Sequence, residues 1–162
     1  MWTIELAAHA DAEEILKLQK LAYQSEAAIY NDATIAPLTQ TLESITADFE
    51  QNLVVKALLD GRIVGSVRAY ERDGTCYVGR LIVHPDCQNR GIGTALMHEI
   101  EQRFAGASRY ELFTGERSER NLHLYRKLGY RVFRSERMSD VLTLVYLEKL
   151  NVQSPLPAAG PS

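Results

Sequence analysis

Hydrophobic residues at helical spacing dominate the first third of the chain. Thr3 to Leu6 alternates like a short strand, and Asp11 then stands at a helix N-cap position before apolar residues three and four apart. This pattern predicts a helix that extends toward Tyr30. After a break at Pro37, a second helix is predicted from about Thr41 to Glu50.

The middle of the chain changes to the two-residue period of β-strands. Apolar and β-branched residues fill Leu53 to Leu59, Ile63 to Tyr70 and Thr75 to Val83. Asp60-Gly61 and Asp73-Gly74 separate these segments, and an Asp-Gly pair favours the tight turn of a β-hairpin. The sequence therefore predicts a meander of three antiparallel strands.

The last third of the chain mixes both periods. Apolar residues four apart predict a helix beginning at Ile92, and Gly129 stands where a later helix would end. The order of strands and helices predicts an α+β domain with a mixed sheet. The predicted elements here are the helix Ile92 to Phe104, the strand Tyr110 to Phe113, the helix Asn121 to Leu128, and the strands Tyr130 to Phe133 and Val141 to Leu147.

The composition is that of an ordinary globular domain. The 162 residues are 46% hydrophobic and 24% charged, and a chain of this length can bury a single hydrophobic core. We expect one domain over residues 1–150. Residues 151–162 contain no charge and three of the five prolines, so we expect a disordered tail there.

Charge, hydropathy and cysteine usage argue against several classes of function. The formal net charge of −3 offers no basic stripe for holding a long nucleic acid. No apolar run approaches the ~20 residues of a membrane span, and the N-terminus lacks a signal-peptide pattern. Cys76 and Cys87 form no CxxC pair, so we expect no disulfide framework and no metal site, and we predict a cytoplasmic location.

A glycine-containing loop separates the third meander strand from the next helix. The strand ends at Val83-His84-Pro85, and Gln88 to Gly93 reads Q-N-R-G-I-G just before the helix. Unpaired backbone N–H groups, the helix dipole and the charge of Arg90 favour an anion such as a pyrophosphate. The alternative is that both glycines only shape a tight turn. The chain contains no P-loop string, and leucine at position 96 removes the third glycine of a Rossmann fingerprint.

Two segments resemble motifs of the GNAT superfamily of acetyl-CoA-dependent N-acetyltransferases. Leu81 to Thr94 is similar to its motif A, which reads Q/R-x-x-G-x-G/A after a strand ending in V-x-P, and Asn121 to Tyr130 is similar to its motif B. The resemblance covers about residues 3 to 149. It implies an α/β/α sandwich with a mixed, largely antiparallel sheet of about six to seven strands flanked by about four helices. It also implies an enzyme that moves an acetyl group from acetyl-CoA to a primary amine by direct attack.

The resemblance assigns roles within these motifs. Leu81 to Val83 would bind the pantetheine arm of acetyl-CoA, with the Val83 amide at the thioester carbonyl, and the loop amides would hold the pyrophosphate. Asn121 would hydrogen-bond the pantetheine side, and Tyr125 would protonate the leaving thiolate as general acid. The alternative for Tyr125 is an aromatic residue packed on the sheet. The implied cofactor-binding residues are Leu81, Ile82, Val83, Gln88, Asn89, Arg90, Gly91, Ile92, Gly93, Thr94, Asn121 and Tyr125.

The general base is not evident from the motifs. The resemblance implies a carboxylate on the third meander strand, but Thr75 to Pro85 contains no Asp or Glu, and Arg80 stands there instead. Glu26 is a candidate for the base or for a wall of the acceptor pocket, because Tyr23, Glu26 and Tyr30 share a helical spacing. The alternative for Glu26 is a solvated helix face. The further candidates are Glu71, His84 and a chain of waters.

The acceptor and the partners stay open at this point. The resemblance places the acceptor pocket at about residues 23–50 and 134–141, and allows a small amine or a protein amine. A CoA-binding regulatory or sensor module without turnover is the alternative function, and transfer of a longer acyl group is a further one. Seven Arg and Lys residues within 115–137 could reach the 3′-phosphate of CoA or simply form a solvated face. A homodimer through the apolar strand Val141 to Leu147 is also implied.

Overall fold

The structure is a computed structural model that describes residues 1–152. The predicted tail, 151–162, therefore lies outside the described residues except for its first two. The strands are β1 (Trp2–Leu6), β2 (Leu53–Leu59), β3 (Arg62–Arg72), β4 (Thr75–Val83), β5 (Arg109–Gly115), β6 (Arg131–Arg137) and β7 (Thr143–Leu150). The α-helices are α1 (Ala12–Ala22), α2 (Gln24–Tyr30), α3 (Ala36–Thr39), α4 (Leu42–Gln51), α5 (Ile92–Arg103) and α6 (Glu119–Lys127), and His9–Asp11 (η1) and Pro85–Cys87 (η2) form 3-10 turns.

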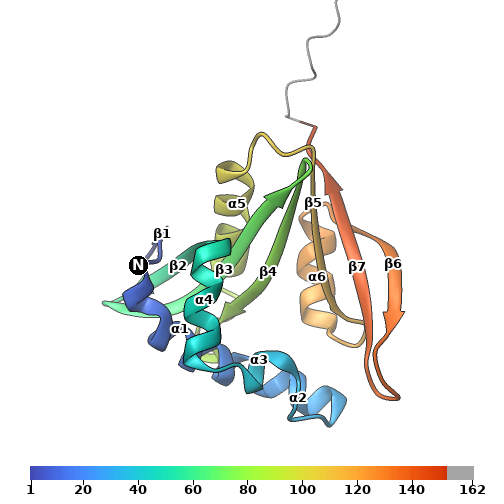
Figure 1. Cartoon of the computed structure of the whole chain (residues 1–162), viewed down its shortest axis with the longest axis horizontal. Helices are drawn as coiled ribbons and strands as arrows, with labels where there is room; N and C mark the ends of the chain where they lie inside the picture. Colours follow the sequence, from blue (N-terminus) through green and yellow to red (C-terminus); the bar gives the residue numbers. More distant parts are fainter. Residues whose placement is uncertain (153–162) are drawn as a thin grey trace, which may run out of the picture.

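These seven strands form one mixed sheet in the order β1-β2-β3-β4-β5-β7-β6 (Figure 1). Each neighbouring pair is antiparallel except β4 and β5, which run parallel. The predicted meander of β2, β3 and β4 is confirmed. Its two turns, Asp60-Gly61 and Asp73-Gly74, have φ between 51° and 84° at all four residues, as tight Asp-Gly hairpin turns require.

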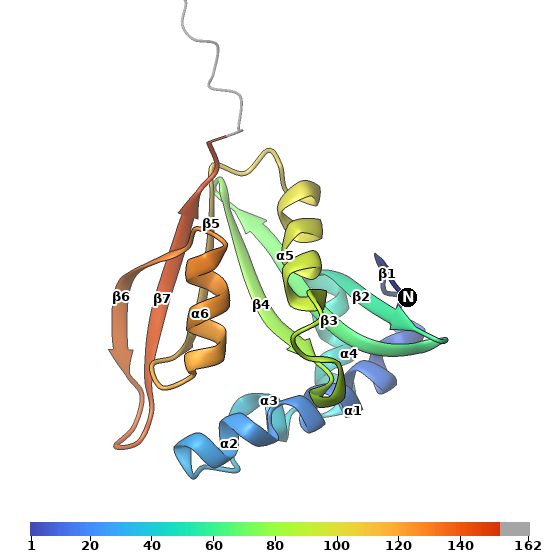
Figure 2. The same ribbon diagram turned by 180° about the vertical axis from the view of Figure 1, so that it is seen from behind.

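Helices cover both faces of this sheet. Figures 1 and 2 show α1 to α4 on one face and α5 and α6 on the other. Leu96, Met97 and Ile100 of α5 are completely buried in the larger hydrophobic core. Ile15 of α1 and Ile45 of α4 belong to a second core on the opposite side. The sandwich expected from the sequence is thus confirmed.

The first predicted helix is divided at Tyr23. α1 packs against β3 and β4, whereas Tyr30 at the end of α2 reaches the loop after β5, where its hydroxyl accepts a hydrogen bond from the Arg117 N–H at 2.8 Å. Because the helix breaks at Tyr23, α1 can pack on the sheet while α2 turns toward the loop after β5. Pro37 lies in the first turn of the short helix α3, which begins at Ala36, and Gln19 donates to the Pro37 carbonyl at 3.0 Å. These two short helices account for the six helices found where about four were predicted.

Three observations concern membrane spans, metal sites and disulfides, which the sequence argued against. No helix within residues 1–152 has both the length and the apolar character to cross a membrane. In the same residues no three His, Cys, Asp or Glu side chains gather as metal ligands. Cys76 and Cys87 are buried free thiols, and burial, with the nearby charges of Glu71 and Glu101, raises the pKa of Cys76 to about 12.

Candidate functional site

A cleft of about 850 Å³ lies where the N-terminal helices, the end of β4, α5 and α6 meet. Its volume falls within the ~300–1,000 Å³ common for ligand pockets. Two predicted site residues are not part of its wall: Arg90 is exposed on the loop, and Tyr125 is buried beside the cleft. The predicted site residues that do line the cleft are Glu26, Leu81, Ile82, Val83, Gln88, Asn89, Gly91, Ile92, Gly93, Thr94 and Asn121.

One wall of the cleft is the edge of β4 that turns away from β3. β4 and β5 pair only between Thr75–Tyr77 and Arg109–Glu111, and beyond that point the two strands diverge (Figures 1 and 2). The His84 N–H donates to the Val64 carbonyl of β3 at 2.8 Å. Because neighbouring residues of a strand present their backbone groups to opposite edges, those of Val83 face the opening. An extended ligand can therefore pair with this edge as a strand would.

The beginning of α5 presents unpaired backbone donors to the same cleft. The first hydrogen bond of the helix runs from the Ala95 N–H to the Gly91 carbonyl at 3.0 Å, so the N–H groups of residues 92–94 precede the bonded turns. Gly91 is the N-cap residue, and its φ of +85° is the left-handed conformation that glycine adopts freely. Together with the dipole of this 12-residue helix, these donors suit an anionic ligand.

α6 forms the facing wall. A Cβ on Gly93 would meet Leu124 Cδ2 of α6 at 3.3 Å, so the two helices approach closely at the cleft. Asn121 Nδ2 donates to Thr114 Oγ1 of β5 at 3.2 Å. This hydrogen bond orients the Asn121 side chain and leaves its carbonyl oxygen able to accept from a ligand amide.

Tyr125 is buried beside the cleft, with 5% of its surface exposed. Burial raises the pKa of its hydroxyl well above the usual value, and the charges of Tyr23 and Glu26 raise it further. Within residues 1–152 the Tyr125 hydroxyl makes no hydrogen bond, although its ring contacts that of Tyr130 at a centroid distance of 6.1 Å. The phenol therefore keeps its proton over the physiological pH range and has that proton to donate to a ligand.

Glu26 is held at the cleft by the N-terminus of α6. The Ser118 hydroxyl donates to Glu26 Oε2, and Ser118 Oγ also lies 3.2 Å from the Tyr30 hydroxyl. Glu26 is half-buried and lines the cleft, so it does not lie on a solvated helix face. Its role as base or acceptor contact stays a prediction.

The two weaker candidates for the base lie elsewhere. Glu71 is exposed and pairs in register with Cys76, near the opposite end of β4 from Val83. His84 Nδ1 accepts a hydrogen bond from the Asp86 N–H at 3.0 Å and so caps the turn η2. The structure brings neither side chain into the wall of the cleft.

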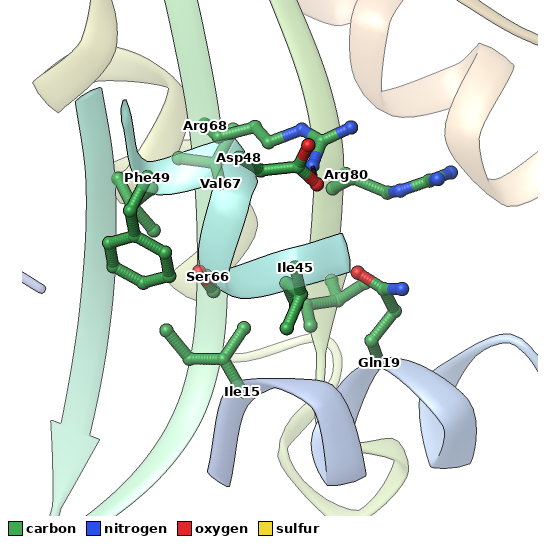
Figure 3. A pocket seen from close by; sticks show the side chains of 11 residues that line it. Ile15, Gln19, Ile45, Asp48, Phe49, Ser66, Val67, Arg68 and Arg80 are labelled. Carbon is green, nitrogen blue, oxygen red and sulfur yellow. Dashed lines mark hydrogen bonds and ion pairs between the residues drawn. The ribbon is translucent and has the colours of Figure 1, made fainter. Parts of the chain in front are cut away.

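A cavity of about 20 Å³ lies between α1, α4 and the strands β3 and β4 (Figure 3). Arg68 and Arg80 both line it. Asp48 pairs with Arg68 through a charged hydrogen bond, and Asp48 Oδ2 also accepts from Gln40 at 2.6 Å. In the sequence, Arg80 stands where a carboxylate was expected. Arg68, Arg80 and Asp48 come from β3, β4 and α4, so no spacing along the chain could reveal that they gather here.

Comparisons with known proteins agree with this geometry. Residues 12–130 match the family model described as the acetyltransferase (GNAT) family. UPF0157 protein YqkA of Bacillus subtilis is 28% identical over 130 residues, which are 78% of this chain and 37% of YqkA. The chain covers less than two thirds of the length of each of the first curated relatives that it matches.

Solved structures share the fold at low sequence identity. The PaiA N-acetyltransferase of Thermoplasma acidophilum, solved in complex with coenzyme A, superposes with a TM-score of 0.80 at 18% identity over 93% of this chain and 99% of that one. The ribosomal-protein-S18-alanine N-acetyltransferase of Escherichia coli superposes with a TM-score of 0.82 at 15% identity over the whole of both chains. At these identities the likeness establishes the fold.

Proposed function

Because the chain belongs to the acetyltransferase (GNAT) family, we propose that it transfers the acetyl group of acetyl-CoA to a primary amine by direct nucleophilic attack. One observation carries the proposal: the free edge of β4 and the unpaired N–H groups of α5 open into one cleft of about 850 Å³. This arrangement suits a ligand with an amide-containing arm and a pyrophosphate, which describes acetyl-CoA. The related PaiA structure holds coenzyme A.

The cofactor contacts follow from the geometry of the two walls. In the proposal the pantetheine arm pairs with the β4 edge at Leu81 and Val83, and the pyrophosphate accepts hydrogen bonds from the N–H groups of residues 92–94. Asn121 accepts from, or donates to, the amides of the arm. Arg90, exposed outside the wall of the cleft, adds positive potential rather than a fixed contact.

The chemical step needs a donor at the carbonyl and an acid at the sulfur. The amine nitrogen attacks the thioester carbon, and the Val83 N–H stabilises the oxyanion that forms. The C–S bond then breaks, and the Tyr125 hydroxyl donates its proton to the sulfur as CoA leaves. The raised pKa of Tyr125 keeps the proton in place until the thiolate develops. No acyl-enzyme forms, so Cys76 and Cys87 take no part.

An incoming ammonium must also lose two protons, one before the attack and one from the nitrogen of the tetrahedral intermediate. The base takes the first, and the second replaces, through water, the proton that Tyr125 gives to the sulfur. Glu26 lines the cleft, and the Ser118 hydroxyl bonded to it fixes its orientation. We assign Glu26 to the acceptor side, where its carboxylate binds the ammonium and receives the proton directly or through water. Of the base candidates taken from the sequence, Glu26 is the one that lines the cleft. Glu119, at the start of α6, is a second carboxylate in the same wall.

Location and assembly follow as further proposals. Two free buried thiols suit a reducing compartment such as the cytoplasm. β7 lies between β5 and β6, so both of its backbone edges are already paired. A homodimer involving this strand would therefore use its side chains and not strand addition.

The proposal is tested by incubating the full chain with acetyl-CoA and a mixed panel of amines, and by measuring release of free thiol. Release that depends on an amine supports the acetyltransferase. Calorimetry with CoA runs in parallel. Tight binding without release across small amines, longer acyl donors and peptide N-termini would favour a CoA-binding module instead.

A further inference from the structure

Arg80 occupies a strained position in the middle of β4. The pairing of β3 with β4 shifts register between Ser66 and Arg68, so that Arg80 and Leu81 together face one residue of β3. At this bulge Arg80 has a φ of +52°, in the left-handed region that glycine adopts freely and residues with a Cβ disfavour. A glycine would form the same bulge with less strain, so the arginine needs a reason beyond the fold.

The guanidinium of Arg80 also lacks a carboxylate of its own. The Asp48 carboxylate accepts from Arg68 and from Gln40. Arg80 extends away from that carboxylate (Figure 3), and within residues 1–152 its buried Nε has no hydrogen-bond partner. Burial and then the charge of Arg68 lower the pKa of Arg80, and they outweigh the interaction with Tyr23 and the more distant charge of Asp48, which raise it. Because a buried charge is normally paired with an opposite one, this site is short of an anion.

Tyr23 connects this cation to the cleft. The Tyr23 hydroxyl interacts with Arg80 and lies within electrostatic range of Glu26. Tyr23 and Glu26 both line the cleft, and Arg80 immediately precedes the strand edge of Leu81 to Val83. Glu26 thus stands in the wall of the cleft, whereas Arg80 lines the smaller cavity and lies behind Tyr23, next to the strand edge at which an acceptor would meet the thioester.

We propose that Arg80 binds a carboxylate of the acceptor, and that the acceptor is an amino-carboxylate of the amino-acid type whose amino group lies toward Glu26. This inference rests on the proposed function, since it names the class of amine that the same site acetylates. The planar fork of guanidinium N–H groups matches the two oxygens of a carboxylate. Binding would pair Arg80 with its missing anion and Glu26 with the ammonium.

The test compares free amino acids with their carboxamides as acceptors for the full chain at saturating acetyl-CoA. Each pair keeps the amino group and the side chain and differs in the negative charge, and short peptides and polyamines complete the panel. We expect at least one amino acid to be acetylated with a kcat/KM roughly 10- to 100-fold above that of its carboxamide. This range corresponds to hydrogen bonds made to a charged group.

Substitutions at Arg80 connect the preference to this side chain. Arg80→Gly removes the guanidinium at a position where glycine is the least strained residue, so we expect the variant to fold. It should raise KM for the amino acid and lose the preference over the carboxamide, whereas Arg80→Lys should keep part of it. Arg72→Gln, exposed at the far end of β3, is the matched control and should behave as wild type.

Three results would count against the inference. Equal kcat/KM for amino acids and carboxamides, with amines still acetylated, would overturn the carboxylate assignment and leave the proposed function standing. A preference that survives Arg80→Gly in a folded variant would do the same. No acetylation of any amine, although acetyl-CoA binds, would overturn the proposed function and this inference with it.

Discussion

The hydroxyl of Ser118, the N-cap residue of α6, donates to a carboxylate oxygen of Glu26 on α2, 92 positions earlier in the chain. Tyr30 of the same helix reaches Ser118 Oγ at 3.2 Å. These contacts fix the N-terminal helices against the helix that carries Tyr125. The proposed base and the proposed acid therefore lie on two elements joined at this hydrogen-bonded corner.

Tyr125→Phe tests the general acid. We expect kcat to fall roughly 100-fold, the usual range for loss of a positioned proton donor. KM for acetyl-CoA should stay within about twofold, because the hydroxyl makes no hydrogen bond within residues 1–152 and its proton is needed only as the sulfur leaves. Thermal unfolding should confirm a folded variant. Tyr70→Phe, at an exposed ring, is the control, and an unchanged kcat in Tyr125→Phe would remove the assignment.

Glu26→Gln tests the base. The amide keeps the shape of the side chain and can still bond Ser118, but it cannot receive a proton. We expect kcat/KM for the amine to fall roughly 10- to 100-fold. Ser118→Ala should give a smaller loss, because it only releases the carboxylate. Glu13→Gln, on the exposed side of α1, should match wild type, and an unchanged kcat/KM for the amine in Glu26→Gln would exclude this role.

Gly91→Ala tests the anion site. At the φ of +85° found at Gly91, an alanine costs about 1 kcal/mol or more. The backbone should therefore shift and turn the N–H groups of residues 92–94 away from the anion. We expect acetyl-CoA to bind about tenfold more weakly by calorimetry, and Gly91→Asn, which tolerates this φ better, to recover part of the loss. Gly61→Ala, at a φ of +78° in the turn between β2 and β3 and with open space around its Cβ, is the matched control away from the cleft. Equal effects of the two alanines on acetyl-CoA binding would exclude the role of Gly91 in the anion site.

Asp11→Asn tests an ion pair that holds the first turn to the sheet. Burial alone would raise the pKa of Asp11, but the Ala8 N–H and the Lys56 ammonium, each at 2.8 Å, outweigh it and lower that pKa. A lowered pKa in the folded state gives stability that is present above about pH 4 and is lost as pH falls through the folded value.

We therefore expect Asp11→Asn to lower the free energy of unfolding by about 1 kcal/mol at pH 7. The difference from wild type should shrink in urea titrations at decreasing pH below 4. Asp140→Asn, whose partner Arg137 is also exposed, should change nothing measurable. A difference for Asp11→Asn that persists unchanged at low pH would point to packing and not to charge.

Local patterns in the sequence were enough to predict the meander of β2, β3 and β4, but not the order of the other strands in the sheet. Asp60-Gly61 and Asp73-Gly74 predicted the two hairpin turns of this meander, and a two-residue turn determines the register of the strands beside it. The break at Tyr23 was not predicted. It depends on where Tyr30 packs, at the end of β5, and a periodic pattern of apolar residues does not carry that information.

The two sequence motifs predicted the residues proposed to bind acetyl-CoA, but not all of the residues on the acceptor side of the site. Gly91 and Asn121 belong to continuous segments, so their place in the cleft could be expected. Ser118 and Arg80 act through partners on other elements, Glu26 and Tyr23. The positive φ of Arg80 arises from a bulge against β3, and nothing in the residues around Arg80 marks that bulge.

Acetyl transfer to an amine is best tested by mass spectrometry of the amine panel after incubation with the full chain and acetyl-CoA labelled with a heavy isotope in the acetyl group. We expect a labelled N-acetyl product, formed in step with free CoA and strongly reduced in Tyr125→Phe. Thiol release without any labelled amine, or no release from a chain that binds acetyl-CoA tightly, would show that the chain does not acetylate these amines.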